Sequence, residues 1–202
     1  MRIIAGSYRS RTLKAPPGFS TRPTSDRLRE TLFNVLAPRI QGAAFLDLYA
    51  GSGAVGIEAL SRGAVQATFV ERAPAAIRIL RGNLEGLGIK SGFRLYPGSV
   101  GAFLRNAVED RPRPIPYEVV YLDPPYDEEQ EYKATLGLIG GAAAVLLAQG
   151  GLVIAEHRRK QAFNERYGSL RLMRQLKQGD AILCFYEVHS TALGPPLTNH
   201  PD

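Results

Sequence analysis

The chain has 202 residues, a net charge of +6 at pH 7 and a single cysteine. That length fits one domain of ordinary size, which can bury a core without disulfides. A single cysteine excludes an internal disulfide, and one cysteine with three scattered histidines offers no zinc-ligand spacing. Because the N-terminus is too charged for a secretory signal, we expect a cytoplasmic protein without a metal centre.

The excess positive charge lies in the first 39 residues. They contain eight Lys or Arg, seven of them Arg, against two acids, whereas the remaining residues contain seventeen charges of each sign. Arginine suits forked contacts to phosphate and stacking on bases, so the pattern indicates a docking surface for a polyanion beside a neutral domain. The alternative is a basic arm that serves only solubility. The candidate contact residues are Arg2, Arg9, Arg11, Arg22, Arg27 and Arg29.

The first predicted elements are a β-hairpin and a helix. Short apolar or mixed runs at 2–5 and 11–14 flank Gly6-Ser7, which is typical of a small hairpin. A helix that ends at Pro38 is predicted next by the helical spacing of Leu28, Leu32, Val35 and Leu36. Its polar side is expected to carry Arg27, Arg29 and Glu30.

From residue 44 the pattern changes to buried strands that alternate with helices. The apolar runs fall at 44–50, 66–71, 93–98, 117–123 and 150–157. Strands buried on both faces with helices between them predict a parallel, doubly wound α/β sheet. After residue 168, two further strands joined by a turn at 177–180 predict an antiparallel hairpin at the end of the sheet. Residues 190–202 have the composition of a flexible tail.

The apolar stretch 136–155 is long enough to resemble a membrane span. It contains Gln149 and two Gly-Gly pairs, which fit a break between two elements better than a continuous span. We therefore interpret it as a buried helix followed by a buried strand.

A glycine-rich loop follows the first of these strands. Gly51, Gly53 and Gly56 match the spacing G-x-G-x-x-G, and Glu71 ends the next strand twenty residues after Gly51. Glycines let the backbone approach a ligand at a helix N-terminus, and the acid accepts hydrogen bonds from ribose hydroxyls. Both features serve any adenosine cofactor, so the loop by itself leaves both a nicotinamide dinucleotide and S-adenosylmethionine open.

Two features favour S-adenosylmethionine. Asp47 lies inside the strand four residues before Gly51, where its carboxylate can face the cationic end of a methionine-type ligand and would repel a pyrophosphate. An antiparallel last strand is also typical of methyltransferase sheets, whereas a dinucleotide-binding sheet normally continues parallel. The alternative for Asp47 is a carboxylate that nearby backbone amides satisfy.

The strand at 117–123 ends in Asp123-Pro124-Pro125-Tyr126. An exocyclic amine is a poor nucleophile because its lone pair is delocalised into the ring, and two acceptors on its N–H bonds turn the lone pair toward a methyl donor. The Asp123 carboxylate and the Pro124 carbonyl are such a pair, held by two prolines that restrict the backbone. Tyr126 would stack on the target base. The alternative is a Pro-Pro turn in which Asp123 is an ordinary cap.

Together, LDLYAGSG, Glu71 and LDPPY resemble class I S-adenosylmethionine-dependent methyltransferases that act on exocyclic amines. RIIAGSYRSRTLKAP at 2–16 and TRPTSDRLRETLFNVL at 21–36 look like the RsmD family, and the resemblance covers residues 2 to about 188. It implies a Rossmann-like fold with a seven-stranded, mostly parallel sheet whose last strand is inserted antiparallel. It also implies a monomeric enzyme that methylates a guanine N2 of 16S ribosomal RNA in the assembling small ribosomal subunit.

The resemblance also implies roles for individual residues. Cofactor contacts are implied for Asp47, Tyr49, Ala50, Gly51, Ser52, Gly53, Glu71, Arg72, Ser99 and Val100. Catalysis is implied for Asp123, Pro124, Pro125 and Tyr126, and the six arginines named above become candidate contacts to RNA. One departure is that such enzymes usually place an aspartate after the third strand, where this chain has Ser99. Its hydroxyl could accept the hydrogen bond of the adenine amino group, with the Val100 amide reaching a ring nitrogen.

Other functions stay open at this point. The tetrapeptide serves any planar amino group, so an adenine-N6 methyltransferase of DNA or RNA is the nearest alternative. A nicotinamide-dependent oxidoreductase and a non-catalytic ribosome-assembly factor are more distant ones. We expect the chain to divide into a basic hairpin and helix packed on the core (1–39), a methyltransferase domain (40–189) and a flexible tail (190–202).

Overall fold

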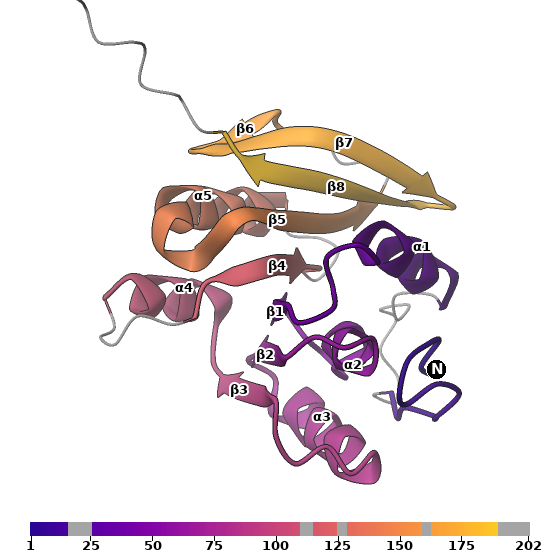
Figure 1. The fold of residues 1–202 in the computed structure, drawn as a ribbon. Coiled ribbons are helices and arrows are strands. Elements are labelled where there is room, and N and C mark those ends of the chain that lie inside the picture. The colour runs from indigo at the N-terminus through magenta and orange to yellow at the C-terminus, as the bar shows by residue number, and fades with distance from the viewer. Residues whose placement is uncertain (16–25, 110–114, 125–128, 159–162, 190–202) are drawn as a thin grey trace, which may run out of the picture.

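The computed structural model describes residues 1–15, 26–109, 115–124, 129–158 and 163–189. Within these residues the strands form one eight-stranded sheet in the order β3-β2-β1-β4-β5-β8-β7-β6 (Figure 1). Its parallel part consists of β1 (Ala44–Leu48), β2 (Gln66–Glu71), β3 (Phe93–Pro97), β4 (Tyr117–Leu122) and β5 (Leu147–Arg158). Its antiparallel part consists of β6 (Arg166–Tyr167), β7 (Leu170–Gln178) and β8 (Ala181–Val188).

This sheet confirms the predicted mostly parallel sheet with an antiparallel terminal hairpin. β8 pairs antiparallel with both β5 and β7, so it is the inserted strand. The turn between β7 and β8 includes Gly179 at φ 61°, where glycine avoids a steric penalty. The two-residue strand β6 was not predicted, because a strand this short leaves no alternating apolar signal.

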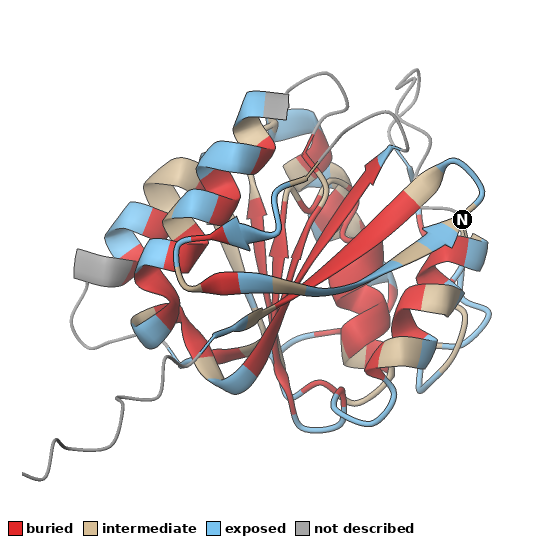
Figure 2. Cartoon of the chain, turned by 90° about the horizontal axis from the view of Figure 1, so that it is seen from above, coloured by how far each residue is buried: buried red, intermediate tan, exposed pale blue. Residues whose placement is uncertain are grey.

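Helices cover both faces of the sheet. They are α1 (Asp26–Leu36), α2 (Ala54–Ser61), α3 (Pro74–Gly86), α4 (Val100–Glu109) and α5 (Glu129–Leu146). Figure 1 shows α4 and α5 on one side, where they enclose the largest apolar core, and α1, α2 and α3 on the other. Figure 2 shows the same layering by burial: the central strands are buried along most of their length, α2 is buried nearly throughout, and the other helices also carry exposed residues.

The apolar stretch 136–155 follows its predicted division. It forms most of α5 and the first part of β5, both packed in the core. In the described parts of the chain, no helix has the length and hydropathy needed to cross a bilayer.

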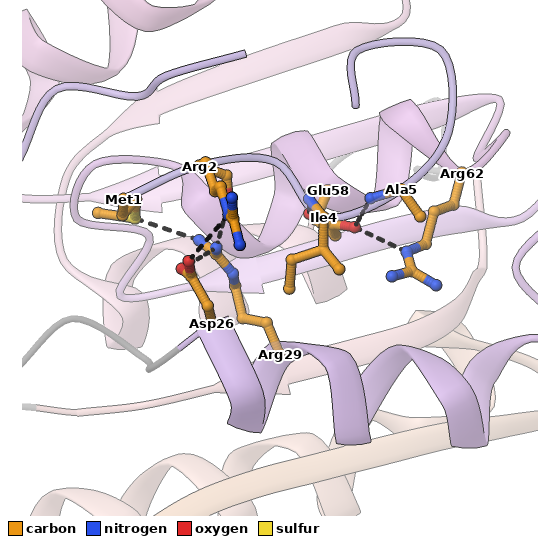
Figure 3. Close-up of polar contacts among 8 residues, drawn as sticks. All are labelled: Met1, Arg2, Ile4, Ala5, Asp26, Arg29, Glu58 and Arg62. Atoms are coloured by element: carbon orange, nitrogen blue, oxygen red, sulfur yellow. Dashed lines mark hydrogen bonds and ion pairs between the residues drawn. The ribbon is translucent and has the colours of Figure 1, made fainter. Parts of the chain in front are cut away.

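Residues 1–15 form an irregular hairpin packed on α2 and α3. Its two arms pair antiparallel at one isolated bridge, Arg2 with Thr12. The buried Glu58 carboxylate of α2 accepts hydrogen bonds from the amides of Ile4 at 2.8 Å and Ala5 at 3.0 Å (Figure 3). These contacts fix the segment to the core. The three-part division of the chain stays a prediction, and the tail, residues 190–202, lies outside the described residues.

Arg29 corrects one expectation. It is fully buried, and its guanidinium donates to the carbonyl of Arg2 at 2.5 Å and to Asp26 Oδ1 at 2.8 Å (Figure 3). Burial lowers its pKa, while the charge of Asp26 opposes that effect. The prediction that Arg29 lies on the polar side of the helix is therefore wrong, and we no longer count it among the RNA contacts. Arg27 and Glu30 are exposed as predicted.

Candidate active site

The order of the strands reverses between β1 and β4, and a ligand-binding crevice is expected at the carboxyl ends of these two strands. The chain runs outward from β1 to β2 and β3 in one direction and from β4 to β5 in the other. In open α/β sheets such a switch point is where ligands bind. The glycine-rich motif follows β1, Glu71 ends β2 and Asp123 follows β4, so three motifs that are distant in the sequence meet at one edge.

The glycine loop turns directly from β1 into α2. Gly51 has φ 56° and Gly53 has φ 81°, and Gly53 is the N-cap of α2. Side chains are disfavoured at such angles. Gly56 serves packing instead, because a Cβ there would clash with the ring of Phe69 on β2. This division of roles among the three glycines is the one expected for a loop that brings backbone amides close to a ligand.

Tyr49 is a non-glycine residue in the left-handed region, at φ 62°. Its hydroxyl contacts Glu131 Oε1 and Thr135 Oγ1 of α5, each at 2.6 Å. The side chain therefore links the cofactor loop to the helix that follows the Asp-Pro-Pro-Tyr motif. A strained backbone held by such contacts is typical of functional loops.

Asp47 is buried at the end of β1. One carboxylate oxygen accepts the Gly56 amide at 2.9 Å. Burial raises its pKa to about 7, with a smaller contribution in the same direction from Glu71, while the Gly56 hydrogen bond opposes the shift. The backbone contact considered as the alternative is thus present. It leaves a carboxyl group whose ionisation a nearby cation would favour.

Glu71 lies at the end of β2 and braces the loop. Its two carboxylate oxygens accept the amides of Gly51 and Ala73, each at 2.8 Å. Each oxygen keeps a second lone pair for a ribose hydroxyl. Arg72 is exposed next to it, which leaves its predicted cofactor contact untested.

Ser99 directly precedes α4 and acts as its cap. The side chain is exposed, and its hydroxyl oxygen accepts the Ala102 amide at 3.2 Å. Val100, the first helical residue, is buried. The hydroxyl is a weaker acceptor than a carboxylate, and the adenine contact predicted for these two residues stays a prediction.

Asp123 has the most unusual environment in the crevice. Its Oδ1 atom is buried, and among the described residues it has no hydrogen-bond partner. Burial raises the pKa of this carboxyl well above its usual range, followed by the negative charges of Glu156 and Asp47, while Arg158 acts in the opposite direction. Among the described residues no donor meets this oxygen, as a cap would require, and the catalytic role of Asp123 stays a prediction. Pro124 is buried beside it, and Pro125 and Tyr126 lie outside the described residues.

The comparisons with known proteins agree with this arrangement. A family model described as conserved hypothetical protein 95 matches residues 1–187. YlbH of Bacillus subtilis is 38% identical over 187 residues, 93% of this chain and 98% of that protein. Ribosomal RNA small subunit methyltransferase D of Escherichia coli is 44% identical over 127 residues, 62% of this chain and 60% of that protein.

The chain belongs to the RsmD family. Among solved structures, yhhF from Escherichia coli is similar with a TM-score of 0.77 and 34% identity, over 93% of this chain and 97% of that one. The fold is that of the S-adenosylmethionine-dependent methyltransferases, as the sequence predicted.

Asn83 joins the N-terminal segment to the cofactor loop, a role that the sequence motifs did not indicate. This buried side chain of α3 accepts the Lys14 amide at 2.8 Å and donates to the Lys14 carbonyl at 3.0 Å and the Ser52 carbonyl at 2.9 Å. Ser52 and Ala50, both predicted cofactor contacts, are buried within the loop that Asn83 supports. An asparagine in a helix carries no sequence signal for such a role.

A buried polar group beside Asp123 was also missed. Glu156 on β5 is 3% exposed, and the Tyr121 hydroxyl of β4 donates to its Oε2 atom. The Tyr132 hydroxyl of α5 donates to the Glu156 carbonyl at 2.8 Å and lies 3.5 Å from the Pro124 carbonyl. The only sequence feature that could have indicated this residue is a glutamate inside an otherwise apolar run.

His157 and Cys184 are core residues. His157 is buried in β5, where Nδ1 lies 2.8 Å from the Arg158 carbonyl and Nε2 lies 3.3 Å from Cys184 Sγ, and its ring stacks on Phe163. Burial lowers the pKa of His157 and raises that of Cys184 to about 11. Both groups are therefore neutral at physiological pH, as expected for packing residues.

Proposed function

We propose that this protein transfers a methyl group from S-adenosylmethionine to the exocyclic N2 of a guanine in 16S ribosomal RNA. The observation that carries this proposal is the Oδ1 atom of Asp123, buried at the crevice without a partner among the described residues. A buried acceptor that lacks a donor is costly. Such a cost is expected where the donor arrives with a substrate, and an exocyclic amine brings two N–H donors.

The crevice suits a cationic adenosine cofactor. Asp47 would face its positive end, the loop at Gly51 would approach its backbone, and Glu71 would accept its ribose hydroxyls. When bound, S-adenosylmethionine supplies an activated methyl group on a positively charged sulfur. A dinucleotide pyrophosphate would instead meet the buried carboxyl groups of Asp47 and Glu156 and the buried Oδ1 atom of Asp123, which supports the methyl donor over a nicotinamide cofactor.

Asp123 and Pro124 would orient the amine. The Asp123 carboxylate accepts one N–H and the Pro124 carbonyl the other, so that the nitrogen lone pair points at the methyl carbon. As positive charge develops on nitrogen, both hydrogen bonds strengthen, and the transition state gains more than the ground state does. The roles assigned to Pro125 and Tyr126 stay predictions.

The substrate class rests on the relatives and on the basic N-terminal segment. The E. coli relative is named a ribosomal RNA small subunit methyltransferase. Arg2, Arg9, Arg11 and Arg27 are exposed, although Arg2 lies 3.7 Å from Asp26 and Arg11 donates to the Gly86 carbonyl at 3.1 Å, and Arg22 lies outside the described residues. We expect the enzyme to act as a monomer on an assembling small ribosomal subunit.

A methylation assay tests the proposal. Small subunits and free 16S RNA from cells lacking the gene are incubated with S-adenosylmethionine and either the wild-type protein or Asp123→Ala, and the digested nucleosides are analysed by mass spectrometry. We expect N2-methylguanosine with the wild type only, with cofactor binding retained by the variant in calorimetry. Detection of N6-methyladenosine instead would show that the target base is adenine. Normal turnover by Asp123→Ala would refute the catalytic role of Asp123.

The basic segment is tested by the salt dependence of RNA binding. Neutralising Arg9 and Arg11 to Gln should lower the slope of log affinity against log salt by about one for each lost phosphate contact. Arg166→Gln with Arg171→Gln, exposed on the opposite edge of the sheet, is the charge-matched control. Equal slopes for both double variants would place the RNA elsewhere.

A further inference from the structure

The register of the sheet places Glu156 beside Asp123. β4 and β5 run parallel, and Leu122 pairs with Ala155 as the last pair of their ladder. The next residues in the same register are Asp123 and Glu156. Neighbouring strands lie about 4.8 Å apart and side chains alternate between faces, so both carboxyl groups point to the face of the sheet that α1 and α2 cover.

Glu156 is held in this position by two tyrosines. The Tyr121 hydroxyl donates to its carboxylate, and the Tyr132 hydroxyl donates to its backbone carbonyl at 2.8 Å. A hydroxyl that donates to a carboxylate favours the ionised form. Glu156 therefore has a hydroxyl donor fixed on its carboxylate, whereas the neighbouring Asp123 Oδ1 atom has no donor within the described residues.

Other charged groups also face this pair. Asp47 on β1 adds a negative charge, and Arg158 on β5 adds a positive one. From α1, the buried Arg29 faces Tyr121, and its own charge is countered by Asp26 and by Glu58 of α2. The burial of Asp123 and the charge of Glu156 are the two largest causes of the raised pKa of Asp123.

We propose that Glu156 is a positioning residue that, through its fixed charge, makes Asp123 a stronger acceptor for the proton of the target amine. The proposal rests on the proposed function and adds a residue that the Asp-Pro-Pro-Tyr motif does not contain. As the nitrogen–carbon bond forms and the carbon–sulfur bond breaks with its electron pair left on sulfur, the amine nitrogen becomes positively charged. It then loses one proton to the Asp123 carboxylate, which passes the proton to water.

The isosteric variant Glu156→Gln tests this role because it removes the charge and keeps the shape. The titration midpoint of the Asp123 carboxyl, followed by carbon-13 NMR and assigned with Asp123→Asn, should fall by about one pH unit. The acid limb of kcat/KM against pH should move to lower pH by a similar amount. A merely structural role of Glu156 would change stability without moving either pH value.

Two further variants complete the experiment. Tyr121→Phe, which removes the hydroxyl that favours the Glu156 charge, should move both pH values in the same direction by less, and it replaces Glu156→Gln if that variant does not fold. Glu85→Gln, an equal charge change at an exposed position of α3, should leave both values unchanged.

Each result distinguishes this inference from the proposed function. An unchanged NMR midpoint in Glu156→Gln overturns the inference whatever the activity is. A lower midpoint with an unmoved acid limb also overturns it, because the basicity of Asp123 would not control the rate. A lower midpoint in a protein whose wild type methylates no RNA upholds the charge coupling and refutes the proposed function.

Discussion

Two carboxyl groups with buried oxygen atoms, those of Glu58 and Asp123, lie on the same face of the sheet and differ in what they contact. Glu58 on α2 accepts the amides of Ile4 and Ala5 and the Nε–H of Arg62, at 2.8, 3.0 and 2.7 Å. The Oδ1 atom of Asp123 at the end of β4 has no donor in the described parts of the chain. A carboxylate with all its donors in place stabilises the structure, and one without them marks a place where a ligand supplies them.

The difference extends to the surroundings of each group. Figure 3 shows two groups of contacts in which opposite charges are paired, Glu58 with Arg62 and Asp26 with Arg29. The crevice instead gathers three carboxyl groups, Asp47, Asp123 and Glu156, near one another. Paired opposite charges offset the free-energy cost of burying each charge. Neighbouring carboxylates repel one another, and a cationic ligand reduces that repulsion.

The largest expected effect is the loss of Glu58. Glu58→Ala leaves two amides and a guanidinium without their acceptor where the N-terminal segment packs on α2, so the free energy of unfolding should fall by about 3–5 kcal/mol. Urea denaturation measures this, and amide exchange at Ile4 and Ala5 should accelerate. Glu30→Ala, an exposed acid on α1, is the matched control. If the free energy of unfolding falls no more than in the control, Glu58 does not hold the N-terminal segment.

The second effect is a pH dependence of stability that originates in the crevice. The pKa of Asp47 is about 7 in the folded protein against 3.8 ordinarily, so the folded state binds more protons between these values. The contribution of Asp47 to the free energy of unfolding is therefore largest near and below pH 4. It falls by about 1.4 kcal/mol per pH unit as the pH rises toward 7. The dependence should flatten in Asp47→Asn. Melting temperatures from pH 5 to 8 measure it, and a rise over this range would contradict it.

A smaller effect is expected where the two regions meet. Asn83→Ala removes the hydrogen bonds between the Asn83 side chain and the backbone of Lys14 and Ser52. We expect the free energy of unfolding to fall by about 2 kcal/mol. Calorimetry should also show weaker binding of S-adenosylmethionine, because Ser52 lies in the cofactor loop. Asn106→Ala, an exposed asparagine bonded to the Tyr96 hydroxyl at 3.2 Å, serves as control. An unchanged affinity for S-adenosylmethionine would show that the N-terminal segment does not influence the cofactor loop.

The smallest effect has the opposite sign. Asp123→Asn removes a buried charge that lacks a donor, so the protein should gain about 1 kcal/mol of stability at pH 8 while it loses methyl transfer. The gain should shrink at pH 5, because the raised pKa of Asp123 favours its neutral form as the pH falls. Thermal denaturation at the two pH values measures this. A loss as large as that of Glu58→Ala would remove the distinction between the two carboxylates.

Much of the fold could be predicted because its signals are local. The apolar runs correspond to β1, β2, β3, β4 and β5, and the turn before Ala181 is where glycine chemistry placed it. Arg29 could not be placed this way. Its helical position alone indicates a polar side, but the N-terminal segment packs over it and supplies the Arg2 carbonyl as acceptor, a contact between residues 27 positions apart.

The sequence by itself determined the residues that follow each strand of the crevice: the glycine loop, Glu71 and Asp123. It could do so because parallel strands bring their carboxyl ends to one edge whatever the details of packing. Only the tertiary structure decided which buried charges are paired and which are not. Glu156 meets Asp123 through the register of β4 and β5, and Asn83 meets Ser52 through the packing of α3. Such contacts depend on distances between elements, which no local pattern encodes.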